Sequence, residues 1–334
     1  MYRIIIVIAT YGLRSLYVKR LFESLFQPSI KKTIIVVNKM PAGHREYLSQ
    51  ITSEKNRVRI ITNSENLGSA IGFGMGIKEA LSDPECDFIW LMDDDTMPEK
   101  STLQTLLEKW EKLSADYGAN NFALVCFRPD QQPEIARGLS TYGYYLRPGC
   151  FFSFHFLNMP SRLLRSVLSA RSKSAEYPET IRVPYAPYGG FFAHRSVYEK
   201  IGLPNSDFVL YKDDLEYTLR LTRAGGYIFL CPSARINSQE IAWDNLRRFP
   251  FGILPWLDSK EEFRIYYGAR NTAYFEKNYY DQKVYRTINR SIYLTLLFLL
   301  SLFMKKKGRF RLIIKAIKEG ELGKLGYNNY FPLP

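Results

Sequence analysis

The sequence predicts an α/β fold: a mostly parallel, mixed sheet flanked by helices, with a C-terminal helical extension. The expected strands are short β-branched or apolar runs at 4–9, 33–37, 58–62 and 88–92. Segments of helical character, such as 13–26 and 72–81, separate them. Strands that alternate with helices form parallel sheets through crossover connections. With 334 residues and 46% hydrophobic content, the chain can bury a large core and carry an appendage.

The stretch 88–98 joins an apolar strand to adjacent carboxylates. Asp93, Asp94 and Asp95 directly follow the run 88–92. A divalent cation between such acids relieves their repulsion, whereas exposed acidic runs seldom cap a segment this hydrophobic. Alternate residues of an extended segment share a face, so Asp93 and Asp95 are expected to point the same way. We assign Asp95 to a metal, and Asp93 to the sugar of a nucleotide or to the outer shell of that metal.

The other expected strands end near polar residues. Ligands of such sheets bind beyond the carboxyl ends of the strands, which brings Thr10, Asn38 and Asp93 to one rim. The hydroxyl of Thr10 and the ring of Tyr11 suit a base or ribose. The third strand is followed by 63–76, which has four glycines within nine residues and leads into a helix, an arrangement that suits phosphate. Its spacing matches neither a Walker A nor a Rossmann fingerprint.

A second acidic group lies far along the chain. Asp213 and Asp214 precede the periodic segment 215–224, which predicts that they occupy the first turn of a helix, where the dipole favours carboxylates. Glu216 and Arg220 are four residues apart and can pair. Capping explains one acid, but two in tandem plus Glu216 exceed it. Asp214 is our candidate general base, with Asp213 or Glu216 orienting it or binding acceptor hydroxyls. With a cation at the first acidic group, these are the parts of metal-assisted group transfer.

Charge and cysteine usage limit the partners. The chain has 46 Lys and Arg against 33 Asp and Glu, a net charge of +13, which suggests nucleic acid, an anionic membrane surface or a phosphorylated substrate. Both acidic groups would repel nucleic acid, and no nucleic-acid motif is recognised, so we expect no such partner. Four scattered cysteines without CxxC spacing argue against a zinc site or disulfide framework and fit a reducing cytosol.

Two segments have the character of surface or membrane contacts. Residues 293–304 are apolar over 12 residues, well below the roughly 20 that a spanning helix needs. Arg286 and Arg290 precede this run and the basic residues 305–309 follow it, which is typical of a helix lying in an anionic interface. A buried helix with a solvated basic end is the alternative. The basic amphipathic stretch 161–176 is consistent with a lid, an acceptor-side helix, a membrane contact or a plain surface helix.

In the order in which they occur, these motifs resemble family 2 glycosyltransferases of the GT-A fold, in particular the bacterial branch with galactofuranosyl- and rhamnosyltransferases. The matching pieces are 8–11, 66–72, 90–98, 189–190, 213–220 and 266–271. The resemblance implies a nucleotide-diphosphate-sugar donor, Mn²⁺ or Mg²⁺, and direct displacement with inversion at the anomeric carbon. The triple Asp and the Asp-Asp-x-Glu pattern look more like galactofuranosyl than rhamnosyl enzymes.

The resemblance also implies site roles. Thr10 and Asp93 fall at donor-contacting positions, Asp95 at the metal ligand, which Asp93 can join, and Asp214 at the catalytic base. We add donor contacts from Tyr11, Asn38, Asn66, Gly68 and Asp94, and acceptor contacts from Gly189, Gly190, His194 and Arg220. One departure concerns a His that many relatives carry after the base-bearing helix. Residues 232–240 contain none, and Asn237, Ser238 or Gln239 is expected in that space.

These observations together predict an inverting, metal-dependent hexosyltransferase that acts on a lipid-linked or polysaccharide glycan. We expect UDP-galactofuranose as the donor, with dTDP-rhamnose as the alternative, and a location on the cytoplasmic membrane's inner face. The expected domains are a catalytic region, 1–246, with a nucleotide-sugar half 1–120 and an acceptor half 121–246, and a membrane-associating region, 247–334. The alternative from another class is a basic nucleic-acid- or glycan-binding protein without catalysis. Oligomeric state is not predicted.

Overall fold

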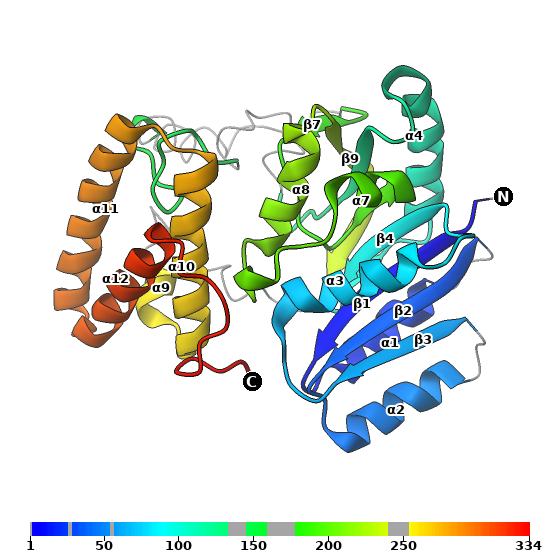
Figure 1. The fold of residues 1–334 in the computed structure, drawn as a ribbon, viewed down its shortest axis with the longest axis horizontal. Coiled ribbons are helices and arrows are strands. Elements are labelled where there is room, and N and C mark those ends of the chain that lie inside the picture. Colours follow the sequence, from blue (N-terminus) through cyan, green and yellow to red (C-terminus); the bar gives the residue numbers. More distant parts are fainter. Residues whose placement is uncertain (1, 26–28, 54–56, 133–144, 159–177, 240–253) are drawn as a thin grey trace.

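The protein is described by a computed structural model that covers residues 2–25, 29–53, 57–132, 145–158, 178–239 and 254–334 (Figure 1). Within these ranges a nine-stranded mixed sheet has the order β3-β2-β1-β4-β8-β6-β9-β5, and β7 pairs with β9. The strands are β1 (Ile4–Tyr11), β2 (Ile30–Asn38), β3 (Val58–Asn63), β4 (Phe88–Asp93), β5 (Thr96–Pro98), β6 (Phe122–Phe127), β7 (Ile181–Val183), β8 (Phe191–His194) and β9 (Tyr227–Ser238). The α/β class is confirmed, and so are the four expected strands.

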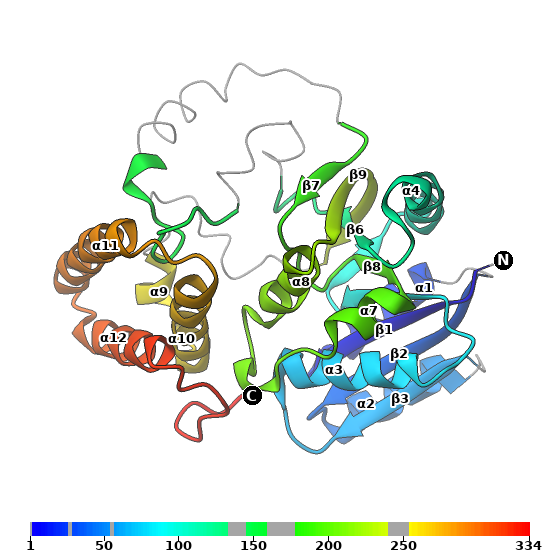
Figure 2. The same ribbon diagram turned by 45° about the horizontal axis from the view of Figure 1, so that its top comes forward.

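The helices flank the sheet and continue into a C-terminal group beside it (Figures 1 and 2). They are α1 (Ser15–Ser24), α2 (Ala42–Ser53), α3 (Gly68–Leu81), α4 (Thr102–Tyr117), α7 (Arg195–Ile201), α8 (Asp213–Arg223), α9 (Leu254–Asp258), α10 (Glu262–Tyr279), α11 (Lys283–Phe303) and α12 (Lys307–Glu321). The predicted C-terminal helical extension is confirmed. Among the described helices, none combines the length and the apolar character needed to cross a membrane.

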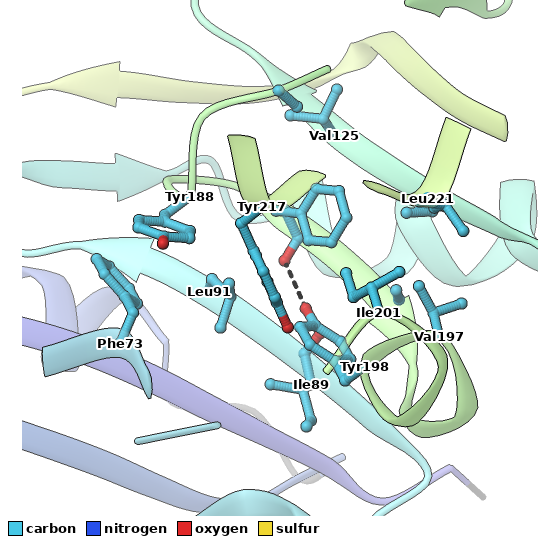
Figure 3. Close-up of a cluster of buried hydrophobic side chains, with 14 of the residues drawn as sticks. Phe73, Ile89, Leu91, Val125, Tyr188, Val197, Tyr198, Ile201, Tyr217 and Leu221 are labelled. Atoms are coloured by element: carbon cyan, nitrogen blue, oxygen red, sulfur yellow. Dashed lines mark hydrogen bonds between the residues drawn. The ribbon is translucent and has the colours of Figure 1, made fainter. Parts of the chain in front are cut away.

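The sheet separates two cores because alternate side chains of each strand point to opposite faces. On β1, Ile5 and Val7 join the core under α3, α7 and α8, whereas Ile4, Ile6 and Ile8 join the core under α1 and α4. All five are fully buried, so the strand is an unbroken apolar run, as expected for parallel strands covered on both faces. Figure 3 shows part of the first core, where Tyr188 lies beside Phe73, their ring centroids 4.2 Å apart.

A third core holds the C-terminal helices together. Tyr267 of α10, Leu297 of α11 and Ile317 of α12 are buried in it with Phe151 and Val209, which precede the extension in the sequence. The helical extension therefore shares its core with the expected acceptor half. The expected boundary at 246 and 247 and the stretch 161–176 lie outside the described residues, and the division into domains stays a prediction.

Candidate active site

Strand register brings the predicted rim together. β1 pairs in parallel with β2 and β4, so that Tyr11 is opposite Asn38 and Ala9 is opposite Asp93. β2 continues in register with β3, where Asn38 is opposite Asn63. The carboxyl ends of these strands therefore lie along one edge, as the α/β pattern predicts.

The three adjacent acids point in different directions. Asp94 is buried: it accepts a 2.7 Å hydrogen bond from the Thr10 hydroxyl, and Arg14 lies 3.4 Å away. Burial raises the pKa of Asp94 to about 7, and Arg14 opposes this shift. The side chains of Asp93 and Asp95 each remain 31% exposed, and they pair with different arginines, Arg128 and Arg14. Thr10 and Asp94 thus bind each other inside the protein, which differs from the expectation that both contact the nucleotide.

The carboxylate of Asp93 is held by an arginine from the next parallel strand. Arg128 directly follows β6, and its Nη2 lies 2.5 Å from Oδ2 of Asp93. A Cβ atom on Gly189 would overlap both groups. The backbone N–H of the following Gly190 (φ +91°) donates to the Leu91 carbonyl of β4 at 2.8 Å. The glycine pair therefore lets this chain segment pass directly against the Arg128–Asp93 ion pair, a position where other residues would collide.

The second acidic group reaches the same place. α8 begins at Asp213, as the sequence predicts, and the Ser69 hydroxyl of α3 donates to this carboxyl group at 2.8 Å. Burial raises the pKa of Asp213, and the neighbouring charge of Asp214 raises it further. Burial also raises the pKa of Asp214; Lys212 lowers it, and the charges of Asp93 and Arg128 act on it from across the site. Asp214 and Asp93 therefore face one electrostatic environment although 121 residues separate them in sequence (214 minus 93).

The backbone before α8 is strained. Val209, Tyr211 and Lys212 have φ values of +65°, +70° and +65°, in the left-handed region that residues with a Cβ rarely adopt. Each such residue costs of the order of 1 kcal/mol or more and persists only where surrounding contacts impose it. Lys212, two residues before the candidate base Asp214, is among them, so the strain is placed where α8 starts.

The contacts that impose this conformation come from α10. The side-chain amide of Asn271 donates to the carbonyls of Phe208, Leu210 and Tyr211 at 2.8, 2.8 and 3.0 Å. The guanidinium of the neighbouring Arg270 donates to the Phe208 carbonyl at 3.1 Å. The 266–271 element noted in the sequence therefore holds the loop that leads into Asp213 and Asp214.

Two predicted acceptor contacts, His194 and Arg220, bind other parts of the protein, and their contact with an acceptor stays a prediction. His194 is opposite Phe88 in the sheet, at the opposite end of β4 from Asp93, and its ring caps α7. Arg220 pairs with Glu216, with Nη2 to Oε2 at 2.6 Å, and donates to the carbonyls of Ile201, which ends α7, and Leu203. Glu216 is buried and also accepts from Tyr279 at 3.0 Å. Glu216 and Arg220 therefore tie α8 to its neighbours.

The expected phosphate loop has a rigid network. Asn38 is buried and donates to the Gly68 carbonyl at 3.2 Å, and Asn66 accepts from the Gly68 amide at 3.1 Å. Gly68 has φ +84°, and a Cβ there would overlap the Val209 carbonyl. Asn66 also donates to the backbone carbonyl of Pro334 at 3.1 Å. These contacts fix the start of α3, and the burial of Asn38 shows that it supports the rim from inside.

The oxygen atoms at the rim decide whether a metal ion fits this site. Within the described residues, no group of three or more His, Cys, Asp and Glu side chains could hold a metal ion. Asp93 and Asp95 are nevertheless partly exposed carboxylates, and Gln239 approaches them by donating its backbone N–H to the Asp95 carbonyl at 2.6 Å. The buried Oε1 of Gln239 has no donor among the residues described. Carboxylate and amide oxygens are the kind of ligand that a hard cation takes, but in this structure Arg128 pairs with Asp93 and Arg14 with Asp95.

Sequence reasoning missed several residues of this site. Arg128 belongs to no motif of the sequence. It directly follows the apolar strand β6, and Asp93 was predicted from its position at the end of the apolar strand β4 in the same way. Arg14 follows the Tyr11 turn and lies 3.3 Å from Asp95. Ser69 lies within a quoted motif but was not singled out. Tyr188 had no signal beyond its position before the glycine pair. Burial raises its pKa, and the nearby charges of Asp213 and Asp214 raise it further.

Comparisons with known proteins agree with this arrangement in the N-terminal part. The family model described as "Glycosyl transferase family 2" matches residues 5–152, which is less than half of the chain. This region contains the rim acids, and it is similar to that family. No curated protein matches the chain.

Among solved structures, the crystal structure of GalNAc-T7 with UDP, GalNAc and Mn²⁺ is similar, with a TM-score of 0.48 and 14% sequence identity. The match covers 82% of this chain and 51% of that chain, so this protein spans about half the length of GalNAc-T7.

Proposed function

We propose that this protein is an inverting glycosyltransferase that moves a sugar from a nucleotide-diphosphate donor to a hydroxyl group of a glycan. The observation that carries the proposal is the hydrogen bond from Ser69 to Asp213, which fixes the start of α8 against the start of α3, where Asn38 of the rim binds the Gly68 carbonyl. The charges of Asp93 and Arg128 act on the pKa of Asp214 there. The match of residues 5–152 to family 2 glycosyltransferases supports the same reaction class.

Asp214 is the general base in this proposal. Its carboxylate takes the proton of the acceptor hydroxyl as that oxygen attacks the anomeric carbon from the face opposite the diphosphate. A new C–O bond forms, the bond to the diphosphate oxygen breaks, and the nucleoside diphosphate leaves with the electron pair. The raised pKa of Asp214 makes it a better proton acceptor near neutral pH than an ordinary aspartate.

Charges on the rim stabilise the donor and the leaving group. Arg128 and Arg14 place cations beside Asp93 and Asp95, and a strand-end site with both signs of charge suits a sugar diphosphate. Asp95 and Asp93 would hold Mn²⁺ or Mg²⁺, which, when bound, neutralises charge that develops on the diphosphate. Tyr11, partly exposed on the same rim, is the candidate for stacking on the base.

Asp213 and Glu216 have positioning roles. Asp213 is 2% exposed and receives the Ser69 hydroxyl, so it fixes α8 against α3. Glu216 is neutralised by Arg220 and lies one turn further along the helix. Gly189 and Gly190, which pass beside Asp93, are the candidates for backbone contact with the acceptor.

The favoured donor is UDP-galactofuranose, with dTDP-rhamnose as the alternative, and the acceptor is a lipid-linked or polysaccharide glycan. Support for the donor comes from the triple Asp at 93–95 and from the Asp-Asp-x-Glu pattern at 213–216. A panel of UDP- and dTDP-sugars, each with and without Mn²⁺ or Mg²⁺, would be tested for protection against thermal unfolding. A native-state ligand at a hundred times its Kd adds about 2.7 kcal/mol of stability. Protection only by a rhamnose donor would replace the favoured assignment.

Asp214→Asn tests the function directly. This substitution keeps size and hydrogen bonding but removes the base, so transfer should fall by about two to four orders of magnitude while donor-induced thermal protection persists. Asp116→Asn, an exposed change on α4, is the matched control and should leave transfer unchanged. Undiminished transfer in Asp214→Asn would refute the base assignment.

The alternative from another class is a basic binding protein without catalysis, which the net charge of +13 favours. It predicts salt-dependent binding of RNA, DNA or glycan and no turnover of any nucleotide sugar. Release of a nucleoside diphosphate from one donor in the panel would exclude it.

A further inference from the structure

Helix α11 presents an exposed apolar face. Its exposed large apolar side chains recur at helical spacing: Val284 (71% exposed), Ile288 (41%), Phe298 (43%), Leu299 (55%), Leu302 (38%) and Phe303 (88%). The helix lies at the outer edge of the C-terminal group, beyond α10 and away from the sheet (Figures 1 and 2). An exposed apolar stripe of this kind marks an interaction surface.

The charged residues within α11 do not lie on this face. Between Lys283 and Lys305 the sequence has two charged residues, Arg286 and Arg290, and both pair with Glu321 of α12, at 3.0 and 3.2 Å. After Lys283, at the first position of the helix, the exposed polar residues of α11 are uncharged: Thr287, Ser291 and Thr295. Helix α4 shows the usual pattern by contrast, because it exposes Gln104, Glu108, Glu111, Lys112 and Asp116. The outward face of α11 is therefore unlike a water-facing helix surface.

Cations border this face at its C-terminal end. Lys305 and Lys307 are exposed shortly after Phe303, and Arg311 is exposed on the first half of α12. Apolar side chains next to a basic cluster complement an anionic bilayer, in which the apolar groups enter the headgroup boundary and the cations contact lipid phosphates. The basic cluster complements the phosphates of an anionic bilayer, whereas no described feature of this face favours a protein partner.

The inner side of α11 is already fixed. Tyr293 and Leu297 are fully buried in the third core. Asn289 donates to the Gly149 carbonyl at 2.8 Å and accepts from the Phe156 amide at 2.9 Å. The outer face can therefore enter an interface while the helix stays packed, so docking does not require any part of the fold to open.

We propose that α11 lies in the plane of an anionic membrane surface, with Phe298, Leu299 and Phe303 inserted and Lys305 and Lys307 against lipid headgroups. This docking surface is separate from the residues of the proposed reaction, and it does not depend on the sugar or on catalysis. It extends the sequence-based expectation for 293–304 back to Val284.

Sedimentation of the full chain with vesicles tests the proposal. The vesicles are phosphatidylcholine alone or phosphatidylcholine with phosphatidylserine. The wild-type protein should sediment with the anionic vesicles and release as salt is raised. The double substitution Leu299→Glu and Phe303→Glu should weaken partitioning about tenfold or more. Lys305→Glu with Lys307→Glu should weaken binding to anionic vesicles and leave the residual binding to neutral vesicles unchanged.

The matched control is Leu16→Glu, which places a charge on an exposed leucine of α1 (49% exposed) and should leave partitioning unchanged. Thermal melts of all variants separate lost binding from lost folding. Two results would overturn the proposal. The first is equal sedimentation of wild-type protein and the Leu299→Glu, Phe303→Glu variant. The second is a wild-type dimer in light scattering that this variant dissociates, because a second copy would then cover the face.

Discussion

The side-chain amide of Asn271 lies 3.0 Å from the carbonyl oxygen of Tyr211, and this hydrogen bond connects helix α10 to the start of α8. Tyr211 has a left-handed backbone conformation two residues before Asp213. Arg264, also on α10, donates to the Tyr211 hydroxyl at 2.7 Å. The C-terminal extension is therefore part of the apparatus that places the second acidic group, although it follows the predicted catalytic region in sequence.

Asn271→Ala should release the strained loop. It removes the donor to the Leu210 and Tyr211 carbonyls, while Arg270 still donates to the Phe208 carbonyl, and this costs about 1 to 3 kcal/mol in the free energy of unfolding, measured by urea titration. Transfer should fall further than stability alone explains, because Asp214 loses its placement. Asn278→Ala on the same helix removes an exposed hydrogen bond to the Tyr274 carbonyl and is the control, with about 0.5 kcal/mol or less lost. Equal losses in both variants would contradict the positioning role.

Gly189→Ala should abolish transfer. The added Cβ overlaps Arg128 and Asp93, so their ion pair must separate, and we expect transfer to fall about a hundredfold or more. Gly74→Ala is the matched control: its Cβ would lie 3.8 Å from Pro204, an ordinary contact, and alanine favours the helix by roughly 0.5 to 1 kcal/mol. A Gly189→Ala protein with wild-type kcat/KM would show that the close approach has no functional weight.

The stabilising effect of Asp213→Asn, relative to the wild-type protein, should grow as the pH rises. Burial raises the pKa of Asp213 in the folded state above its value in the unfolded chain. The contribution of Asp213 to the free energy of unfolding of the wild-type protein is therefore highest at low pH, where Asp213 is protonated in both states. It falls as the pH rises from the unfolded-state pKa to the folded-state pKa. The amide keeps an acceptor for Ser69 and does not ionise. The gap in unfolding free energy between variant and wild type should therefore widen from pH 5 to pH 8 by about 1 to 3 kcal/mol. A pH-independent gap in chemical denaturation would show that Asp213 is not held protonated.

Arg128→Met should shift the pH dependence of transfer. Arg128 lowers the pKa of Asp214, while burial raises it more. The acid limb of kcat/KM should therefore lie above the ordinary aspartate range in the wild-type protein, and it should move to higher pH in the variant, by about one unit. Lys112→Met, an exposed change on α4, should leave the limb in place. If the acid limb of kcat/KM lies at the same pH in Arg128→Met and in the wild-type protein, Arg128 does not act on the pKa of Asp214.

The two acidic groups could be located from short stretches of sequence, whereas their partners could not. Asp93 could be located because it ends an apolar strand, and Asp213 because it starts a periodic helix, and both signals are read within about ten residues. Arg128 carries the same strand-end signal and was missed because nothing in the sequence pairs it with Asp93. His194 was assigned to the acceptor from its proximity to Gly190, but it lies at the other end of β4, because β8 runs antiparallel to β4 and carries its residues away from the rim.

The sequence by itself determined the α/β class, the four parallel strands, the acids that end β4 and start α8, and the helical character of the C-terminal extension. Each of these follows from periodicity and residue type within a short window. Only the tertiary structure decided that Asp94 turns inward to Thr10, that Arg128 binds Asp93, and that Asn271 holds the loop before Asp213. These pairings join residues 35 to 84 positions apart (128 minus 93; 94 minus 10), and they depend on how strands and helices pack, which local patterns do not encode.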